Sequence, residues 1–332
     1  MAYENVYVPE IFGDENLYED AIIQTSGLTK RFGHEFAVRD VTFQVTGGQI
    51  FGFIGPSGSG KTTTIRILTG YYQQTSGKVL VFNTPPTKFT QEMRERIGYM
   101  PQLSILYPNL SVWENLNFIA SIYGMSLLRR KRLNELLDFV ELKEHKRKLA
   151  RSISGGMQRR LSLAATLVHK PDLVFLDEPT AGVDPVLRSK FWDHFRKLRE
   201  QGRTLFITTQ YVGEAAYCDL VGVMREGRLL IVDTPEGLRY RAYGGDVVNL
   251  QTVEPMDVKT EQDLNQEHFV KGKIIRAEGN CVRIVVDDAS TAIPALLDWC
   301  RANSIAVHSV DQFFPPFDDV FVKLVEEDDT YE

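Results

Sequence analysis

Short apolar runs bounded by turn residues occur along the first two thirds of the chain. Between residues 21 and 54, apolar and polar positions alternate around Gly47-Gly48, a pattern that predicts antiparallel strands. The runs LVFLD (Leu173–Asp177) and LFITT (Leu205–Thr209) are continuously apolar, as in strands that a parallel sheet buries on both faces. Helical patterns occupy residues 61–68, 127–142 and 157–167. This alternation predicts an α/β unit with an additional antiparallel layer.

The pattern changes near Tyr243. Residues 234–245 predict a turn, a short helix and a glycine pair, after which four short runs are typical of strands and Thr291–Ala302 of a helix. The first twenty residues hold six carboxylates and no Lys or Arg, and we expect a loosely docked acidic arm because chain ends are usually poorly ordered. We therefore divide the chain into an acidic arm (1–20), a main unit (21–242) and a small α+β accessory domain (243–332).

Composition narrows the class of protein. The 332 residues are 43% hydrophobic and 25% charged, which is typical of a globular protein. The net charge of −6 offers no general attraction for nucleic acid, so we expect no nucleic-acid partner. No run approaches the roughly 18 apolar residues of a membrane span, and the start does not resemble an export signal. Three widely spaced cysteines predict neither disulfides nor zinc and fit a reducing cytosol.

A glycine-rich loop carries the first chemical signal. Residues 55–62 read GPSGSGKT, which satisfies G-x-x-x-x-G-K-[ST] between an apolar strand and a helix. Glycines let backbone N–H groups turn inward toward an anion, which the helix N-terminus also attracts. We expect Lys61 to neutralise the β- and γ-phosphates of a nucleotide and Thr62 to hold Mg²⁺. The predicted nucleotide-binding positions here are Gly55, Pro56, Ser57, Gly58, Ser59, Gly60, Lys61, Thr62 and Thr63.

Two carboxylates end the LVFLD strand. Ligands bind at the carboxyl ends of parallel strands, so we expect Asp177 to hold Mg²⁺ and Glu178 to orient or deprotonate the attacking water. An Asp-Glu step alone more often begins a loop, and this interpretation therefore depends on Lys61. Together the three residues predict a nucleotide hydrolase.

The segment RSISGGM (residues 151–157) resembles the LSGGQ signature loop of ATP-binding cassette (ABC) ATPases, and it precedes Asp177 at the spacing of that family. The resemblance covers roughly Ile23 to Tyr240. It implies a P-loop NTPase cassette with a RecA-like core, an antiparallel β layer and a helical subdomain, and ATP and Mg²⁺ as cofactors. It also implies that Ser154, Gly155 and Gly156 contact the γ-phosphate held by a second cassette, so that two cassettes enclose two ATP molecules.

Three further positions match family elements in order. Gln102 matches the Q-loop, whose side chain reaches Mg²⁺ or water. Phe32 matches the aromatic residue that stacks on adenine, and Asp184 matches the D-loop that crosses the dimer interface. Taken singly, Gln102 is typical of a solvated glutamine, Phe32 of a core residue and Asp184 of an Asp-Pro turn. The surrounding motifs favour the functional interpretation.

Two positions depart from the family pattern. Gln210 occupies the place of the switch histidine, and Met157 replaces the usual signature glutamine. A glutamine amide orients a phosphate but carries no positive charge. With Glu178, Lys61 and Gln210 as the catalytic set we expect slow but real hydrolysis, with a degenerate site as the competing interpretation. TTQY followed by Glu214, and the segment FDDVFV near the C-terminus, resemble the daunorubicin-resistance group of drug and lipid exporters.

The resemblance implies a subunit that hydrolyses ATP to power a separate multi-span membrane permease, for export of a hydrophobic compound. Such a subunit would be peripheral, at the cytoplasmic face of the membrane, and would pair with an identical or a different cassette. The alternative is a soluble ABC-type ATPase in DNA repair, chromosome or ribosome function. Only 52 positions (154 − 102) separate Gln102 from Ser154, which leaves no room for a long coiled-coil or zinc insertion.

Overall fold

The computed structural model describes residues 21–103, 105–277 and 279–330, and the predicted acidic arm lies outside them. The chain forms two compact units, of which the first ends at Val232 and the second begins at Asp233. The helix α7 (Pro235–Tyr243) therefore belongs to the second unit, whereas the boundary expected from the sequence follows this helix.

A six-stranded sheet forms the centre of the first unit. Its strand order is β5-β6-β7-β3-β8-β9, and the neighbouring strands from β5 to β8 pair in parallel. The strands β3, β6 and β7 are buried along their whole length, as parallel strands covered on both faces should be. The strands are β3 (Ile50–Ile54), β5 (Ile97–Met100), β6 (Leu173–Asp177), β7 (Thr204–Thr209), β8 (Leu220–Arg225) and β9 (Arg228–Asp233).

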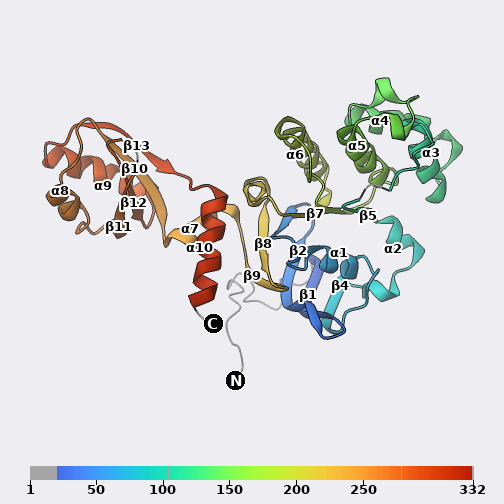
Figure 1. The fold of residues 1–332 in the computed structure, drawn as a ribbon, viewed down its shortest axis with the longest axis horizontal. Helices are drawn as coiled ribbons and strands as arrows, with labels where there is room; N and C mark the ends of the chain where they lie inside the picture. The colour runs from blue at the N-terminus through green and yellow to red at the C-terminus, as the bar shows by residue number, and fades with distance from the viewer. Residues whose placement is uncertain (1–20, 104, 278, 331–332) are drawn as a thin grey trace. The chain divides into compact units, whose positions relative to one another are not determined.

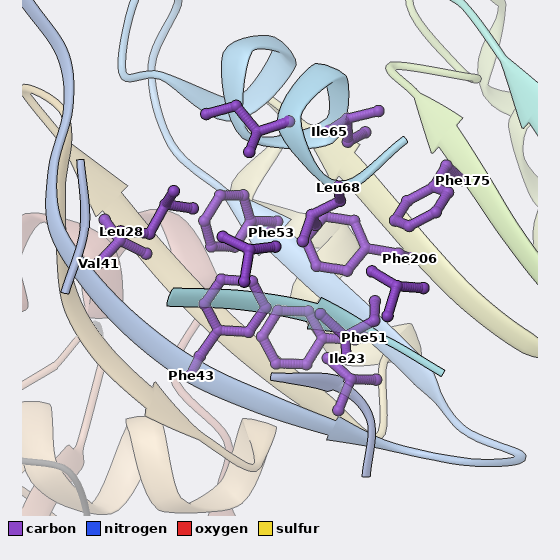
Figure 2. Packing of buried hydrophobic residues seen from close by; sticks show 14 of the residues in the cluster. Ile23, Leu28, Val41, Phe43, Phe51, Phe53, Ile65, Leu68, Phe175 and Phe206 are labelled. Carbon is purple, nitrogen blue, oxygen red and sulfur yellow. The ribbon is translucent and has the colours of Figure 1, made fainter. Parts of the chain in front are cut away.

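An antiparallel sheet packs against this centre, as the alternating pattern predicts. It has the order β2-β1-β4, with β1 (Ala21–Phe32), β2 (Glu35–Thr46) and β4 (Ser76–Val81). Phe43 of β2 stacks on Phe51 of β3 with ring centroids 5.4 Å apart, and Phe206 of β7 lies 5.2 Å from Phe51. Figure 2 shows these rings together beneath Ile65 and Leu68 of α1 (Lys61–Leu68). This aromatic core fixes the strand ends that carry the predicted site.

Helices supply the remaining parts of the first unit. The helices α3 (Val112–Ile122), α4 (Arg130–Phe139) and α5 (Gly155–Thr166) pack together as a helical subdomain (Figure 1). The helix predicted over 127–142 is shorter, because Glu141 adopts a left-handed φ of 57° just after α4. The other elements are α2 (Gln91–Glu95), α6 (Pro185–Glu200) and the 3₁₀ segments Pro86–Lys88, Leu127–Arg129, Lys143–His145, Ala150–Ser152 and η7 (Val212–Tyr217).

The second unit contains a four-stranded antiparallel sheet of order β11-β12-β10-β13. Two helices interrupt the strands along the chain, which gives the β-α-β-β-α-β arrangement of a split βαβ fold. Val248, Ile284 and Leu296 belong to its core, and α7 packs against α10. The remaining bounds are β10 (Asp246–Thr252), α8 (Val258–Leu264), β11 (Val270–Arg276), β12 (Cys281–Val286), α9 (Ala289–Ala302), β13 (Val307–Phe313) and α10 (Phe317–Thr330).

Candidate nucleotide-binding site

The loop between β3 and α1 has a conformation that depends on its glycines. Gly58 and Gly60 adopt φ angles of 82° and 101°, in the left-handed region that side chains disfavour. A Cβ on Gly60 would lie 2.4 Å from the carbonyl oxygen of Ala37, and a Cβ on Gly55 would lie 2.1 Å from that of Met224. Both distances are sterically forbidden, so the loop keeps its concave shape only with glycine at these positions.

Lys61 begins α1, and its side chain lies along the inside of this loop. Its Nζ donates to the carbonyl oxygens of Gly55 and Pro56, each at 2.8 Å, and the residue is 4% exposed. Burial lowers the pKa of Lys61, while the charges of Glu178 and Asp177 raise it. A polyphosphate bound to the loop would supply this amine with charged acceptors in place of the carbonyls.

Thr62 and Asp177 meet at the end of β6. The Thr62 hydroxyl donates to Oδ1 of Asp177 at 3.0 Å, and the Thr208 hydroxyl donates to the same oxygen at 2.7 Å. Asp177 is 1% exposed. A hydroxyl beside a carboxylate is an oxygen donor set that suits Mg²⁺, which usually takes its remaining ligands from water and substrate phosphates. The described residues contain no cluster of three or more His, Cys, Asp or Glu side chains that could hold a metal without such help.

Glu178 adjoins Gln102, although the two residues are 76 positions apart. The Gln102 amide Nε2 donates to Oε2 of Glu178 at 2.9 Å. The backbone N–H of Glu178 is shared between the carbonyl oxygen and the hydroxyl of Thr208, each at 3.0 Å. Glu178 is 7% exposed and has a φ of 46°, an uncommon angle for a residue with a side chain. Such strain is found at functional sites, where surrounding contacts hold a side chain in a fixed direction.

Arg159 joins these loops and was not predicted from the sequence. Its guanidinium donates to the carbonyl oxygens of Pro101 and Gln102, and to those of Glu178 and Pro179. Burial lowers the pKa of Arg159, while Asp177 and Glu178 raise it. The signal that could have found it is an arginine on the buried face of α5, three and seven residues before Ser162 and Thr166.

The other predicted residues lie at separate places on the first unit. Ser154 accepts a hydrogen bond from the Met157 N–H at 3.3 Å and caps α5, and Asp184 caps α6 by accepting from the Leu187 N–H at 3.0 Å. Both are exposed, and so is Gln210 after β7. Within the described chain, no hydrogen bond or ion pair joins any of the three to Lys61 or Thr62.

Phe32 is 44% exposed and is therefore not a core residue. Its ring meets that of Tyr72 edge to face with centroids 5.3 Å apart, and the Lys30 amine lies 4.9 Å from its centroid. An exposed aromatic ring beside a second one is suited to stacking against a planar heterocycle.

Comparison with known proteins identifies the family of this chain. The family model described as ABC transporter matches residues 38–181. The Nod factor export ATP-binding protein I of Burkholderia lata is 35% identical over 250 residues, which are 75% of this chain and 82% of that protein. The chain belongs to the ABC transporter ATP-binding family. The expected cassette fold is confirmed by this membership and by the structural match described next.

Two other relatives show how far the cassette resemblance extends. The probable multidrug ABC transporter ATP-binding protein YbhF of Escherichia coli is also 35% identical over 75% of this chain, and the chain spans 43% of that protein's length. A solved ATP-binding cassette, a dimer in a post-hydrolysis state bound to ADP and Pi, is 25% identical with a TM-score of 0.59 over 64% of this chain and 98% of its own. Among the described residues, no helix is long and apolar enough to cross a membrane.

Proposed function

We propose that this cassette binds and hydrolyses ATP to power a separate multi-span membrane permease, which exports a hydrophobic drug, lipid or related compound. The observation that carries the proposal is the convergence of Lys61, Thr62, Asp177, Glu178 and Gln102 at neighbouring strand ends. Phosphate charge, a divalent cation and an attacking water each have a partner in that set.

Each of these residues has a separate role in hydrolysis. Lys61 and the loop amides bind and orient the β- and γ-phosphates. Thr62 and Asp177 would hold Mg²⁺, and the ion, when bound, supplies charge neutralisation between phosphates. The Glu178 carboxylate is held by Gln102 at 2.9 Å and accepts the proton of the attacking water. Phe32 stacks on the adenine ring, which its exposure allows.

Gln210 distinguishes this cassette from those with a histidine at the same position. It follows β7 directly, next to Thr208 and Thr209, which are buried. Its amide donates to a γ-phosphate oxygen without adding positive charge, so it orients the phosphate and stabilises the transition state less than an imidazolium does. Turnover is therefore slow but real.

A second cassette completes the site. Ser154 and Gly155 are exposed at the start of α5, and Asp184 is exposed before α6, so all three are accessible to another chain. The dimeric cassette bound to ADP and Pi supports this arrangement by analogy. The partner is a second copy or a different chain of the same family.

Exposed apolar side chains beside Gln102 support a protein partner at the membrane. Leu103 is 82% exposed and Ile105 73%, and the rings of Tyr107 and Phe118 lie 4.6 Å apart nearby on the helical subdomain. Large apolar side chains exposed in one region of a chain are typical of an interaction surface. A permease docked there would place the cassette at the cytoplasmic face of the membrane, as a peripheral subunit.

The decisive experiment measures Mg²⁺-dependent ATP binding and hydrolysis by the purified chain, beside Lys61→Ala as a control that removes the phosphate-binding amine. Binding and hydrolysis by the unsubstituted chain, both weakened in the variant, support the proposal. Recovery of the chain with a multi-span membrane protein supports the partner. Absence of any adenine-nucleotide affinity, or hydrolysis stimulated by nucleic acid with no membrane partner, contradicts it.

A further inference from the structure

The buried Glu214, four residues after Gln210, forms an ion pair with the partly exposed Arg188. The Glu214 carboxylate is 3% exposed, and its Oε1 lies 3.8 Å from Nε of Arg188 on the first turns of α6. The Thr180 hydroxyl donates to the same Oε1 at 2.7 Å. The other oxygen, Oε2, is buried with no hydrogen-bond partner in the described structure. At 3.8 Å, with one partner partly exposed, this pair adds little stability by itself. Its contacts with the neighbouring segments are therefore its more specific feature.

The pair holds both ends of the loop from Thr180 to Asp184. Glu214 receives the hydroxyl of Thr180 at the beginning of this loop. Near its end, Nη2 of Arg188 donates to the carbonyl oxygen of Val183 at 3.4 Å. Asp184 follows directly and caps α6. The exposed Asp184 carboxylate, which we propose contacts a second cassette, follows directly on Val183, to which Arg188 is bonded. Thr180, at the other end of the loop, is bonded to Glu214.

The same pair also holds the segment that carries Gln210. The Arg188 guanidinium lies 4.1 Å from the ring centroid of Tyr211, the residue after Gln210. One helical turn further along α6, Trp192 contacts Tyr217 with ring centroids 5.1 Å apart. Positions 188 and 192 are on one face of a helix, so that face of α6 lies along η7. A displacement of α6 therefore moves the chain around Gln210.

We propose that Glu214 and Arg188 are positioning residues that couple the Thr180–Asp184 loop to Gln210. Contact of Asp184 with a second cassette displaces or fixes the start of α6, and the pair transmits this to Tyr211 and so to the Gln210 amide. Gln210 then orients the γ-phosphate only when the second cassette is in place. This inference rests on the proposed function, because it assigns Gln210 a role in hydrolysis.

Glu214→Ala removes the partner of both Thr180 and Arg188, and Glu214→Gln keeps an acceptor for Thr180 but removes the charge. The matched control is Asp219→Ala with Asp219→Asn, because Asp219 pairs with Arg199 of the same helix at 2.6 Å. We expect Glu214→Ala to lower kcat roughly 10- to 100-fold with little change in ATP affinity, as misplaced groups do. Glu214→Gln should recover part of this loss, and the Asp219 variants should keep the original kcat.

Two readouts separate positioning from a general structural role. If Glu214 acts through Gln210, the double variant Glu214→Ala/Gln210→Ala is no slower than the slower single variant, whereas independent effects multiply. In ligand-free protein, amide hydrogen exchange should speed up in residues 180–184 and 209–217 together for Glu214→Ala and in neither for Asp219→Ala. Unchanged exchange in both segments, or multiplied kinetic effects, overturns the coupling. The exchange result does not depend on ATP, so it is distinct from failure of the unsubstituted chain to bind nucleotide.

Discussion

Arg159 offers the sharpest test of how the site is held together. Its guanidinium is the donor to four carbonyl oxygens, those of Pro101, Gln102, Glu178 and Pro179. In Arg159→Met the aliphatic stem remains but all four bonds are lost. The carbonyl of Glu178 keeps a second donor, the N–H of Ala181 at 3.2 Å, so three acceptors lose the donor that they have in this structure. At about 1 kcal/mol for each acceptor, the first unit should lose about 3 kcal/mol of unfolding free energy.

The loss is measurable as a change in melting temperature. About 3 kcal/mol corresponds to a decrease of roughly 6–12 °C for a unit of this size. Two of the three tryptophans, Trp113 and Trp192, belong to the first unit, and Trp299 belongs to the second. Thermal unfolding followed by tryptophan fluorescence in a Trp299→Phe background therefore reports on the first unit alone.

Arg132 provides the matched control. It is an arginine of the helical subdomain with intermediate exposure, and its Nη2 donates to one carbonyl, that of Leu167, at 2.8 Å. Arg132→Met should lower the unfolding free energy by about 1 kcal/mol. If Arg159→Met is no more destabilising than Arg132→Met, the four carbonyl contacts do not hold the loops as described.

Four further outcomes follow from the site and its surroundings. Glu178→Gln should bind ATP, accumulate closed dimers seen by size-exclusion chromatography and hydrolyse ATP roughly 100-fold more slowly or worse, as loss of a general base requires; near-normal turnover would exclude that role. Gln210→Ala should lower kcat more than Gln210→His, and equal rates for both would remove Gln210 from the mechanism. Chelation of Mg²⁺ with EDTA should abolish phosphate release, and release that persists in EDTA would contradict the assignment of Thr62 and Asp177. Burial lowers the pKa of His194 below its ordinary 6.5, so the unfolded chain binds the proton more readily than the folded chain. The free energy of unfolding is therefore highest above pH 6.5 and declines as the pH falls below it. In urea titrations His194→Phe should reduce this decline by up to about 1.4 kcal/mol per pH unit, and an unchanged pH dependence would contradict it.

The sequence predicted the parts of this protein that depend on local pattern. The apolar run Leu173–Asp177 is β6 with the same bounds, because a strand buried on both faces needs apolar residues at every position. The phosphate loop was predictable because its glycines and lysine lie within eight consecutive residues. The helix expected over Thr291–Ala302 is α9, which begins two residues earlier and ends at the same residue.

Contacts between distant segments could not be predicted in the same way. The pairing of Gln102 with Glu178 spans 76 positions, and that of Thr180 with Glu214 spans 34. Nothing in the residues around Arg159 specifies four carbonyl acceptors, since the acceptors come from loops that meet only in the folded unit. Helix α8 was not predicted because it is mostly polar, and only Leu264 among its residues is buried.

The position of the Lys61 amine has a consequence for which anions the loop selects. Its Nζ already donates to two carbonyl oxygens at 2.8 Å, and an anion that binds the amine replaces these hydrogen bonds. The net binding free energy is therefore only the difference between the two sets of contacts. A single orthophosphate ion, small and strongly hydrated, gains little from that exchange. A chain of three phosphates reaches the amine and several loop amides at once and gains from each. We therefore expect the loop to discriminate by phosphate chain length, so that free orthophosphate competes poorly with a nucleoside triphosphate.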